Sequence, residues 1–162
     1  MTAPSVRPFE AGDALALTEI LNAIIAAGGT TAYMTPFTPS ALRAAHLDGP
    51  SVLCCHTVLL GTVPVGFQVL NVNPQLPEGW GDIASFTRRD PPMRGAGTAL
   101  FAATRSQAHR LGLTALNATI RADNTPGLGY YARMGFIERA RIVGAPLADG
   151  TPVDRIQKTF VL

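Results

Sequence analysis

The 162-residue sequence predicts an α+β fold with about seven strands and about four helices, in one domain that spans residues 1–162. Two apolar segments, 51–60 and 63–72, are separated only by Gly61-Thr62, a spacing that is typical of an antiparallel hairpin. A later strand-like segment, 113–120, lies between two helical segments, as in a strand-helix-strand unit. A chain of this length can bury most of its apolar surface around one core, and the sequence contains no internal repeat or linker.

The chain begins with a short strand and an amphipathic helix. Residues 5–9 suit the strand, and Asp13 can cap a helix over 14–27 because its carboxylate can accept hydrogen bonds from the first turn. Apolar residues recur on one face of this helix, as burial against a sheet requires. Gly28 is expected to end it.

A second, shorter helix follows a polar segment that is rich in Thr and Pro, residues 30–38. Thr38 is its predicted cap, Pro39 occupies its first position, and Gly49 lies beyond its end. The two strands of the hairpin come next, and 81–87 is expected to form a fourth strand.

Helices and strands then alternate to the end of the chain. An apolar helical stretch is expected at 100–111, before the strand at 113–120. Thr125 is the predicted cap of the next helix, with Pro126 near its start and Gly135 at its end. The last two strands are expected at 136–143 and 153–162, with a turn near Asp149 and Gly150 between them.

Composition and charge argue against several classes of function. Thirteen basic and 11 acidic residues give a formal net charge of only +2, without the dense basic run that nucleic-acid binding favours. No apolar stretch suits a membrane span or a signal peptide. Cys54 and Cys55 are adjacent in a predicted strand and poorly placed to bond to each other, which indicates a reduced, cytoplasmic setting. The low charged fraction, 15%, leaves room for an apolar patch and so for a homodimer.

Residues 94–99, Arg-Gly-Ala-Gly-Thr-Ala, are the most informative segment of the sequence. Small residues leave several backbone N–H groups uncovered at a helix start, where unpaired donors and the helix dipole favour a bound phosphate group. The segment therefore predicts a pyrophosphate site, with a flexible loop before an ordinary helix as the plain alternative. A dinucleotide-binding loop fits less well, because Leu100 stands where that motif requires Gly or Ala.

Two motifs in this sequence resemble those of the GNAT superfamily of N-acyltransferases. Arg94, Gly97 and Ala99 match the acyl-CoA-binding motif Q/R-x-x-G-x-G/A. In the second motif an Asn precedes a helix, a Tyr lies seven residues later, and Gly-Phe ends the helix. The matching residues are Asn124, Tyr131, Gly135 and Phe136. The order of strands and helices also matches, so the resemblance implies the GNAT fold, with a central mixed, mostly antiparallel, twisted sheet.

The resemblance implies acetyl-CoA as the cosubstrate. Tyr131 would be the general acid, with a buried structural tyrosine as the alternative. The backbone N–H groups of the fourth strand near Phe86-Thr87-Arg88-Arg89 would hold the acyl carbonyl. Gly127 costs roughly 1 kcal/mol relative to alanine inside a helix, which indicates close approach to either a strand or the pantetheine arm. The expected CoA-binding residues are Phe86, Thr87, Arg88, Arg94, Gly95, Ala96, Gly97, Thr98, Ala99, Asn124, Gly127 and Tyr131.

An enzyme that uses a CoA thioester must align the amine, stabilise the oxyanion and move protons, and it needs no nucleophilic cysteine. Asp82 and Glu78 are the nearest carboxylates for deprotonating the incoming ammonium, and we favour Asp82, with a solvated strand-end aspartate as the alternative. His46, His56 and His109 show no ligand spacing, and no metal motif occurs in the sequence.

The acyl acceptor is indicated only loosely. Residues 22–36 are loosely similar to the phosphinothricin acetyltransferase branch of the family, whose members acetylate small amino-acid-like amines, and Tyr33 and Trp80 could line a pocket for such an acceptor. We therefore expect direct transfer of acetyl from acetyl-CoA to the primary amine of a small or amino-acid-like molecule. Two alternatives stay open: acetylation of a protein N-terminus or lysine, and an inactive CoA-binding module that serves sensing or assembly.

Overall fold

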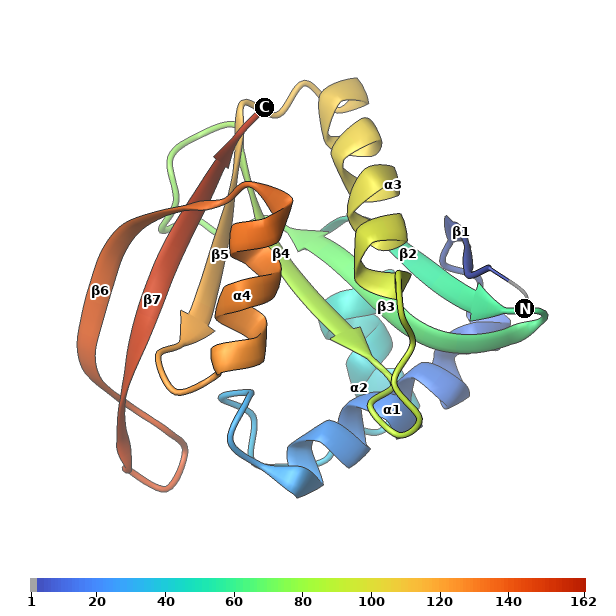
Figure 1. The fold of residues 1–162 in the computed structure, drawn as a ribbon, viewed down its shortest axis with the longest axis horizontal. Helices are drawn as coiled ribbons and strands as arrows, with labels where there is room; N and C mark the ends of the chain where they lie inside the picture. The colour runs from blue at the N-terminus through green and yellow to red at the C-terminus, as the bar shows by residue number, and fades with distance from the viewer. Residues whose placement is uncertain (1–2) are drawn as a thin grey trace.

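The computed structural model describes residues 3–162, and within this range seven strands form a single sheet (Figure 1). The strand order is β1-β2-β3-β4-β5-β7-β6, and every neighbouring pair is antiparallel except β4 and β5, which are parallel. The predicted mixed, mostly antiparallel sheet is therefore confirmed; residues 1–2 of the predicted domain lie outside the described range. The strands are β1 Ser5–Pro8, β2 Val52–Leu60, β3 Val63–Asn71, β4 Trp80–Thr87, β5 Ala115–Arg121, β6 Ile137–Pro146 and β7 Pro152–Val161.

Helices cover both faces of the sheet (Figure 1). On one face, α1 and α2 pack over β2, β3 and β4, and on the other face α3 and α4 lie over the centre of the sheet. The four α-helices of the described range match the predicted number. They are α1 Ala14–Ala27, α2 Pro39–Leu42, α3 Ala96–Arg110 and α4 Thr125–Met134, with a short 3-10 turn η1 at Ala11–Asp13 and a π-helical turn η2 at Arg43–Leu47.

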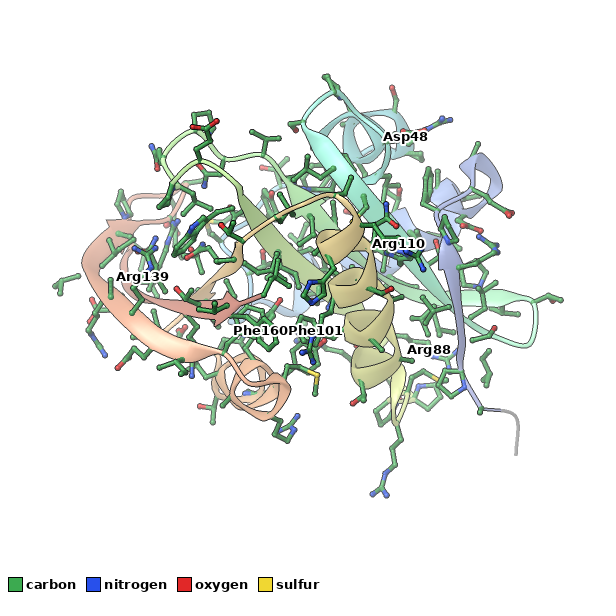
Figure 2. All side chains as sticks on the ribbon, turned by 90° about the horizontal axis from the view of Figure 1, so that it is seen from above. Asp48, Arg88, Phe101, Arg110, Arg139 and Phe160 are labelled. Atoms are coloured by element: carbon green, nitrogen blue, oxygen red, sulfur yellow. The ribbon has the colours of Figure 1, made fainter. Side chains whose placement is uncertain are left out.

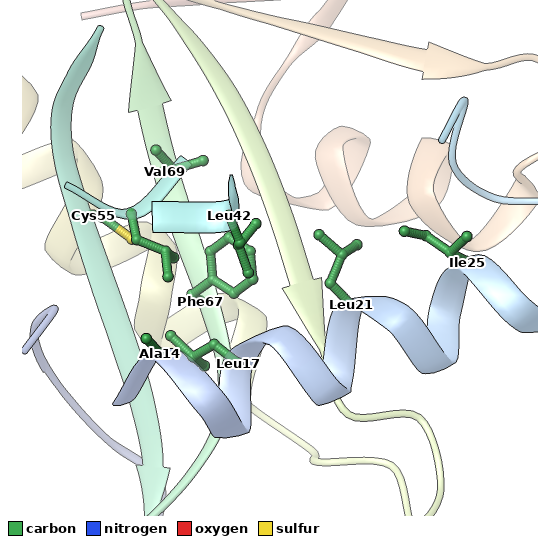
Figure 3. Packing of buried hydrophobic residues seen from close by; sticks show 9 residues of the cluster. Ala14, Leu17, Leu21, Ile25, Leu42, Cys55, Phe67 and Val69 are labelled. Carbon is green, nitrogen blue, oxygen red and sulfur yellow. The ribbon is translucent and has the colours of Figure 1, made fainter. Parts of the chain in front are cut away.

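The α1 helix forms where the sequence predicted it, because its apolar side chains recur on one face. Leu17 and Leu21 are fully buried and pack with Phe67 of β3 (Figure 3). Gly28 ends the helix with a φ of 70°, a left-handed value that a side chain would disfavour. The core on this face thus joins the first helix to the hairpin of β2 and β3.

The opposite core lies between the sheet and the helices α3 and α4. Phe101 of α3 packs against Phe160 of β7, with ring centroids 5.2 Å apart (Figure 2). Cys54 contributes to this core and Cys55 to the core under α1, as expected for neighbours on one strand. Both thiols are free, and burial raises the pKa of Cys54 to about 11, so this thiol is not ionised at neutral pH.

Three predicted helix starts need correction. The side chain of Asp13 does not cap α1, because its carboxylate binds Arg7 (2.7 Å) and Thr57 (2.9 Å) instead. Asn124, and not Thr125, is the cap residue of α4. The α3 helix already begins at Ala96, within the glycine-rich segment and ahead of the predicted apolar stretch.

The pairing of β4 with β5 is short, and this opens the sheet. Only Trp80–Asp82 of β4 is in register with Ala115–Asn117 of β5. Beyond Asp82 the two strands diverge, and the gap between them widens toward their C-terminal ends (Figure 1). None of the helices in residues 3–162 is long and apolar enough to cross a membrane.

The buried carboxylate of Asp13 generates a prediction for stability. Arg7 lowers the pKa of Asp13, so the stabilisation is fully present above the ordinary pKa of an aspartate and is lost as the pH falls through the lower folded pKa. We expect Asp13→Asn to lower the free energy of unfolding by about 2 kcal/mol at pH 7, because Arg7 loses its charged partner. Urea denaturation should show this difference shrinking below about pH 4.

The matched control is Asp48→Asn, which removes an exposed ion pair with Arg43. Exposed pairs contribute little, so this variant should stay within about 0.5 kcal/mol of the wild type. An equal loss in both variants, or a loss in Asp13→Asn that does not depend on pH, would contradict a specific role for the buried carboxylate.

Candidate functional site

A cleft of about 730 Å³ occupies the gap between β4 and β5. It is lined by the C-terminal halves of these strands, the start of α3, one side of α4 and the loop that follows α1. Gly97 and Tyr130 line it from the face that α3 and α4 cover, and Tyr33 and Phe86 line it from the opposite face. The cleft therefore passes through the sheet, and two molecules can meet in it from opposite sides.

The backbone of β4 supplies hydrogen-bond donors to this gap. The N–H of Arg88 donates to Val65 O of β3 (2.8 Å), and N–H groups alternate in direction along an antiparallel strand. The N–H of Phe86 therefore also faces β3, whereas those of Ser85 and Thr87 face the gap. Of the predicted CoA-binding residues Phe86, Thr87 and Arg88, only Thr87 has its N–H directed into the gap, and Ser85 is a second donor that sequence reasoning missed.

Side chains at this end of β4 hold the adjoining loops in place. The guanidinium of Arg88 donates to Pro91 O (3.2 Å) and contacts the sulfur of Met93 (3.1 Å). The guanidinium of Arg89 donates to Thr30 Oγ1 (2.7 Å) in the loop after α1. The arginine pair after β4 thus fixes the rim of the cleft.

The start of α3 has the donors expected of a phosphate site. Among residues 3–162, the N–H groups of Gly97 and Thr98 have no backbone acceptor, and both residues line the cleft with exposed Arg94. Gly95 adopts a φ of 80° just before the helix, which turns the chain into it. Ala96 is different, because its side chain is fully buried in the core and its N–H donates to Met93 O (3.3 Å). Neither Ala96 nor Ala99 lines the cleft.

Gly97 is required by an aromatic neighbour. The hydroxyl of Tyr130 donates to Gly97 O (2.7 Å) and accepts from Gln68 Nε2 (3.0 Å). A Cβ added at position 97 would lie 2.5 Å from Cε1 of Tyr130, which is closer than atoms can approach. Sequence reasoning gave Tyr130 no role, but it ties the start of α3 to α4 and β3.

Tyr131 lies in the cleft wall beside β4. It is buried, and its hydroxyl shares a hydrogen bond with Ser85 Oγ (2.9 Å), which also accepts from Gln68 Nε2 (2.7 Å). Burial raises the pKa of Tyr131 above its ordinary value, so the phenol stays protonated at neutral pH. This arrangement suits a proton donor at the point where β4 and β5 part.

Asn124 and Gly127 have structural partners. The amide of Asn124 accepts from the N–H of Gly127 (3.0 Å) and donates to Thr30 O (3.2 Å). A Cβ on Gly127 would lie 2.5 Å from Nδ2 of Asn124, so the close approach that the sequence indicated is to this amide and not to a strand. Asn124 therefore caps α4 and holds the loop after α1 against it.

Asp82 lies where the two strands part but does not line the cleft. Its carboxylate accepts from Asn117 Nδ2 of β5 (2.9 Å) and from Asn73 Nδ2 (3.1 Å). Its negative charge contributes to raising the pKa of Tyr33 and opposes the effect of burial on His46. Trp80, expected near the acceptor, stacks under the guanidinium of Arg139 (5.4 Å) and does not line the cleft.

His46 is a polar residue that sequence reasoning left without a role. One ring nitrogen is hydrogen-bonded to the hydroxyl of Tyr33, and Nδ1 lies 2.9 Å from Nδ2 of Asn71. Burial lowers the pKa of His46, so the imidazole is neutral at pH 7 and able to accept a proton. Three segments distant in sequence bring these residues together, so no local spacing could have shown the cluster.

A smaller hollow of about 400 Å³ adjoins the cleft at Ala32 and Tyr33. Met34, Phe37 and Ala148 are among its mostly apolar lining residues. Within residues 3–162 there is no group of three or more His, Cys, Asp or Glu side chains that could hold a metal ion.

Comparisons with known proteins agree with this architecture. Residues 17–136 match the family model described as the acetyltransferase (GNAT) family. A GNAT superfamily phosphinothricin acetyltransferase from Sinorhizobium meliloti, in complex with acetyl-CoA, is 18% identical, with a TM-score of 0.85 over 100% of this chain and 89% of that chain. A comparison with curated proteins gives no match.

Two further solved structures share the fold. A GCN5-related N-acetyltransferase from Kribbella flavida is 21% identical, with a TM-score of 0.84 over 99% of this chain and 98% of that chain. A ribosomal-protein-alanine N-acetyltransferase from Brucella melitensis is 16% identical, with a TM-score of 0.83 over 97% of this chain and 99% of that chain.

The contact between Gly97 and Tyr130 can be tested by a double-mutant cycle. We expect Gly97→Ala to lower the free energy of unfolding by about 2 kcal/mol, because the new methyl group overlaps the ring. In a Tyr130→Ala background the same change should cost much less, since the ring is gone. Chemical denaturation of the four proteins measures both values.

Gly129→Ala is the control for this cycle, because its Cβ would meet only the flexible end of Arg133 at 3.3 Å. This variant should be tolerated, with a gain from helix propensity of up to about 1 kcal/mol. An equal cost of Gly97→Ala in both backgrounds would show that the ring is not the reason for glycine at this position.

Proposed function

Because the chain belongs to the acetyltransferase (GNAT) family, whose members use acetyl-CoA as cosubstrate, we propose that it acetylates the primary amine of a small or amino-acid-like acceptor. The observation that carries this proposal is the cleft that passes through the sheet between β4 and β5. An acyl donor bound on the face of α3 and an amine entering from the opposite face would meet beside β4. Direct attack then needs no covalent enzyme intermediate.

The chemistry of the cleft fits acetyl-CoA. Two backbone N–H groups at the start of α3, those of Gly97 and Thr98, and the helix dipole favour a pyrophosphate. Among the described residues that line the cleft, none is Asp or Glu, and the cationic ones are Arg88, Arg89, Arg94, Arg121, Arg133 and Arg155. Arg94 is exposed beside the helix start and supports the same assignment.

Acetyl-CoA supplies a thioester that is already activated toward amines. We assign the oxyanion donors to the N–H groups of Ser85 and Thr87, which face the gap. The hydroxyl of Tyr131, protonated and held by Ser85, supplies the proton for the departing thiolate. These assignments use groups from the two sides of the same opening in the sheet.

The proton of the incoming ammonium needs an acceptor on the opposite face. We assign the proton acceptor to His46, which is reached through Tyr33, because Tyr33 lines the cleft and its hydroxyl is bonded to the imidazole. Asp82, predicted as the base, supports this transfer through its charge. A neutral His46 that carries its hydrogen on Nδ1 can take the proton at the ring nitrogen that faces Tyr33. Nδ1 then donates to Asn71 Oδ1, which has no other partner, once the Asn71 amide is turned over. The nearby charge of Asp82 stabilises the imidazolium that results.

A protein N-terminus and a lysine side chain are the alternative acceptors. The chain shares its fold with a ribosomal-protein-alanine N-acetyltransferase, so the N-terminus of a protein is the second candidate acceptor. A lysine side chain of a protein is the third. An inactive CoA-binding module would bind CoA without releasing thiol in the presence of any amine. A homodimer and a cytoplasmic location stay predictions; exposed Ile137, Val143 and Val161 on β6 and β7 offer an apolar surface for a second copy.

The role of Tyr131 can be separated from that of its neighbour. Tyr131→Phe should lower kcat by about 10²-fold, because the proton donor is lost, and leave the KM for acetyl-CoA within about threefold. Tyr130→Phe should instead raise the KM for acetyl-CoA, because its hydroxyl holds Gly97. Thiol release from acetyl-CoA with a panel of primary amines measures both; full activity of Tyr131→Phe would remove it from the mechanism.

The base assignment makes a prediction about pH. Asp82→Asn should lower kcat by about tenfold at pH 7, because the imidazolium of His46 loses the nearby negative charge. The KM for acetyl-CoA should stay unchanged, because Asp82 does not line the cleft. Raising the pH toward the pKa of the free amine should restore part of the rate, since the amine then arrives unprotonated. Asp48→Asn serves as the control, because it removes an exposed carboxylate that lies just after η2. A loss in Asp82→Asn that is constant with pH would argue against proton transfer.

A further inference from the structure

Arg155 is a cation in the wall of the cleft, and its side chain has no partner among residues 3–162. It lies on β7, directly opposite Arg121 of β5 in the antiparallel register. Its Nε is buried and has no hydrogen-bond partner. Within residues 3–162 no carboxylate forms an ion pair with it, because Asp154 pairs with Arg141 (2.8 Å) and Asp123 with Arg121 (2.8 Å).

Placing two arginines opposite each other is unfavourable unless negative charge compensates them. Like charges directly across an antiparallel pair are destabilising. Arg121 is compensated by Asp123 and also donates to Thr31 O (3.0 Å), so its position is fixed. Arg155 has no such compensation, and it is only partly exposed, which leaves a guanidinium partly removed from water beside a second one.

A compensating anion for Arg155 can come from CoA or from the acceptor, and the face of the sheet on which Arg155 lies distinguishes the two. Ile120 and Ile156 are paired and buried, and Ile120 belongs to the core under α3 and α4. Because side chains alternate across a strand, the neighbouring Arg121 and Arg155 point to the opposite face. The donors at the start of α3 serve phosphate groups on the first face, so the charge of Arg155 is available to the molecule that enters from the other side.

We propose that Arg155 binds the carboxylate of the acceptor and thereby selects α-amino acids and closely related amino acids over simple amines. This inference rests on the proposed function and gives its acceptor a chemical class. A planar guanidinium can bind a carboxylate through two parallel hydrogen bonds, which fixes the orientation of the ligand as well as its charge. The compensated Arg121 holds the strand and loop around it.

The test compares amino acids with molecules that differ only at the carboxylate. The panel contains L-phenylalanine, its methyl ester and 2-phenylethylamine, and L-leucine, its methyl ester and 3-methylbutylamine, with a short peptide beginning with each residue. Thiol release from acetyl-CoA gives KM and kcat for each. The wild type should prefer each free amino acid over its ester and amine at least about tenfold in kcat/KM, measured at matched concentrations of unprotonated amine.

Arg155→Gln should raise the KM for the amino acids at least about 30-fold and leave kcat/KM for the esters and amines within about threefold. The KM for acetyl-CoA should not change. Arg155→Lys should recover part of the preference, because it restores the charge without the planar fork. Arg141→Gln, an exposed arginine of β6 outside the cleft, is the control and should leave all values unchanged.

Three results would overturn the inference. The first is a higher KM for acetyl-CoA in Arg155→Gln, which would assign the charge to a CoA phosphate. The second is an equal loss of kcat/KM with every amine in this variant. The third is a wild type that turns over esters, amines or peptides as well as free amino acids. In these cases acetyl transfer itself is still observed. Failure of the proposed function is a separate result, in which no amine in the panel releases thiol, and the inference then falls with it.

Discussion

The site depends on the short pairing of β4 with β5. These are the only parallel neighbours among the described strands, and they are in register over just Trp80–Asp82 before they diverge. A buried backbone N–H without a partner is costly, so donors that face such a gap call for a ligand or water. The opening that weakens the sheet is therefore also the feature that presents Ser85 and Thr87 to a substrate.

Two adjacent tyrosines connect this opening to the helices around it. Tyr130 bonds to the backbone of Gly97 at the start of α3, and Tyr131 bonds to Ser85 on β4. Gln68 of β3 donates to both Tyr130 and Ser85, so one amide links the aromatic contact at the start of α3 to the centre of the cleft. The aromatic pair thus positions the two chemical ends of the site relative to each other, and glycine at position 97 is the steric condition for it.

The two faces of the sheet differ in their chemistry at the cleft. The face of α3 and α4 presents backbone donors and protonated tyrosine hydroxyls, which suit phosphate groups and a leaving thiolate. The opposite face presents Tyr33, whose hydroxyl is bonded to His46, and the two arginines of β5 and β7. The charge of Asp82 acts on this pair from outside the cleft. A cleft that joins these faces can keep donor and acceptor apart until their reactive atoms meet.

The sequence alone determined the order of the helices and strands, the extent of α1, the Thr38 cap of α2 and the hairpin at Gly61-Thr62. It also determined the family. Each of these depends on local patterns of apolar residues, caps and motifs. All of the predicted CoA-binding residues except Ala96 and Ala99 line the cleft, because the end of β4, the start of α3 and one side of α4 meet there. Tertiary structure decided which backbone N–H groups face the gap, because that depends on the register of β4 with β3. It likewise decided the partners of Asp13, the contact of His46 with Tyr33 and the pairing of Arg121 with Arg155. Each of these joins segments far apart in the chain, whose alignment is set by packing of the whole sheet and cannot be derived from spacing along the sequence.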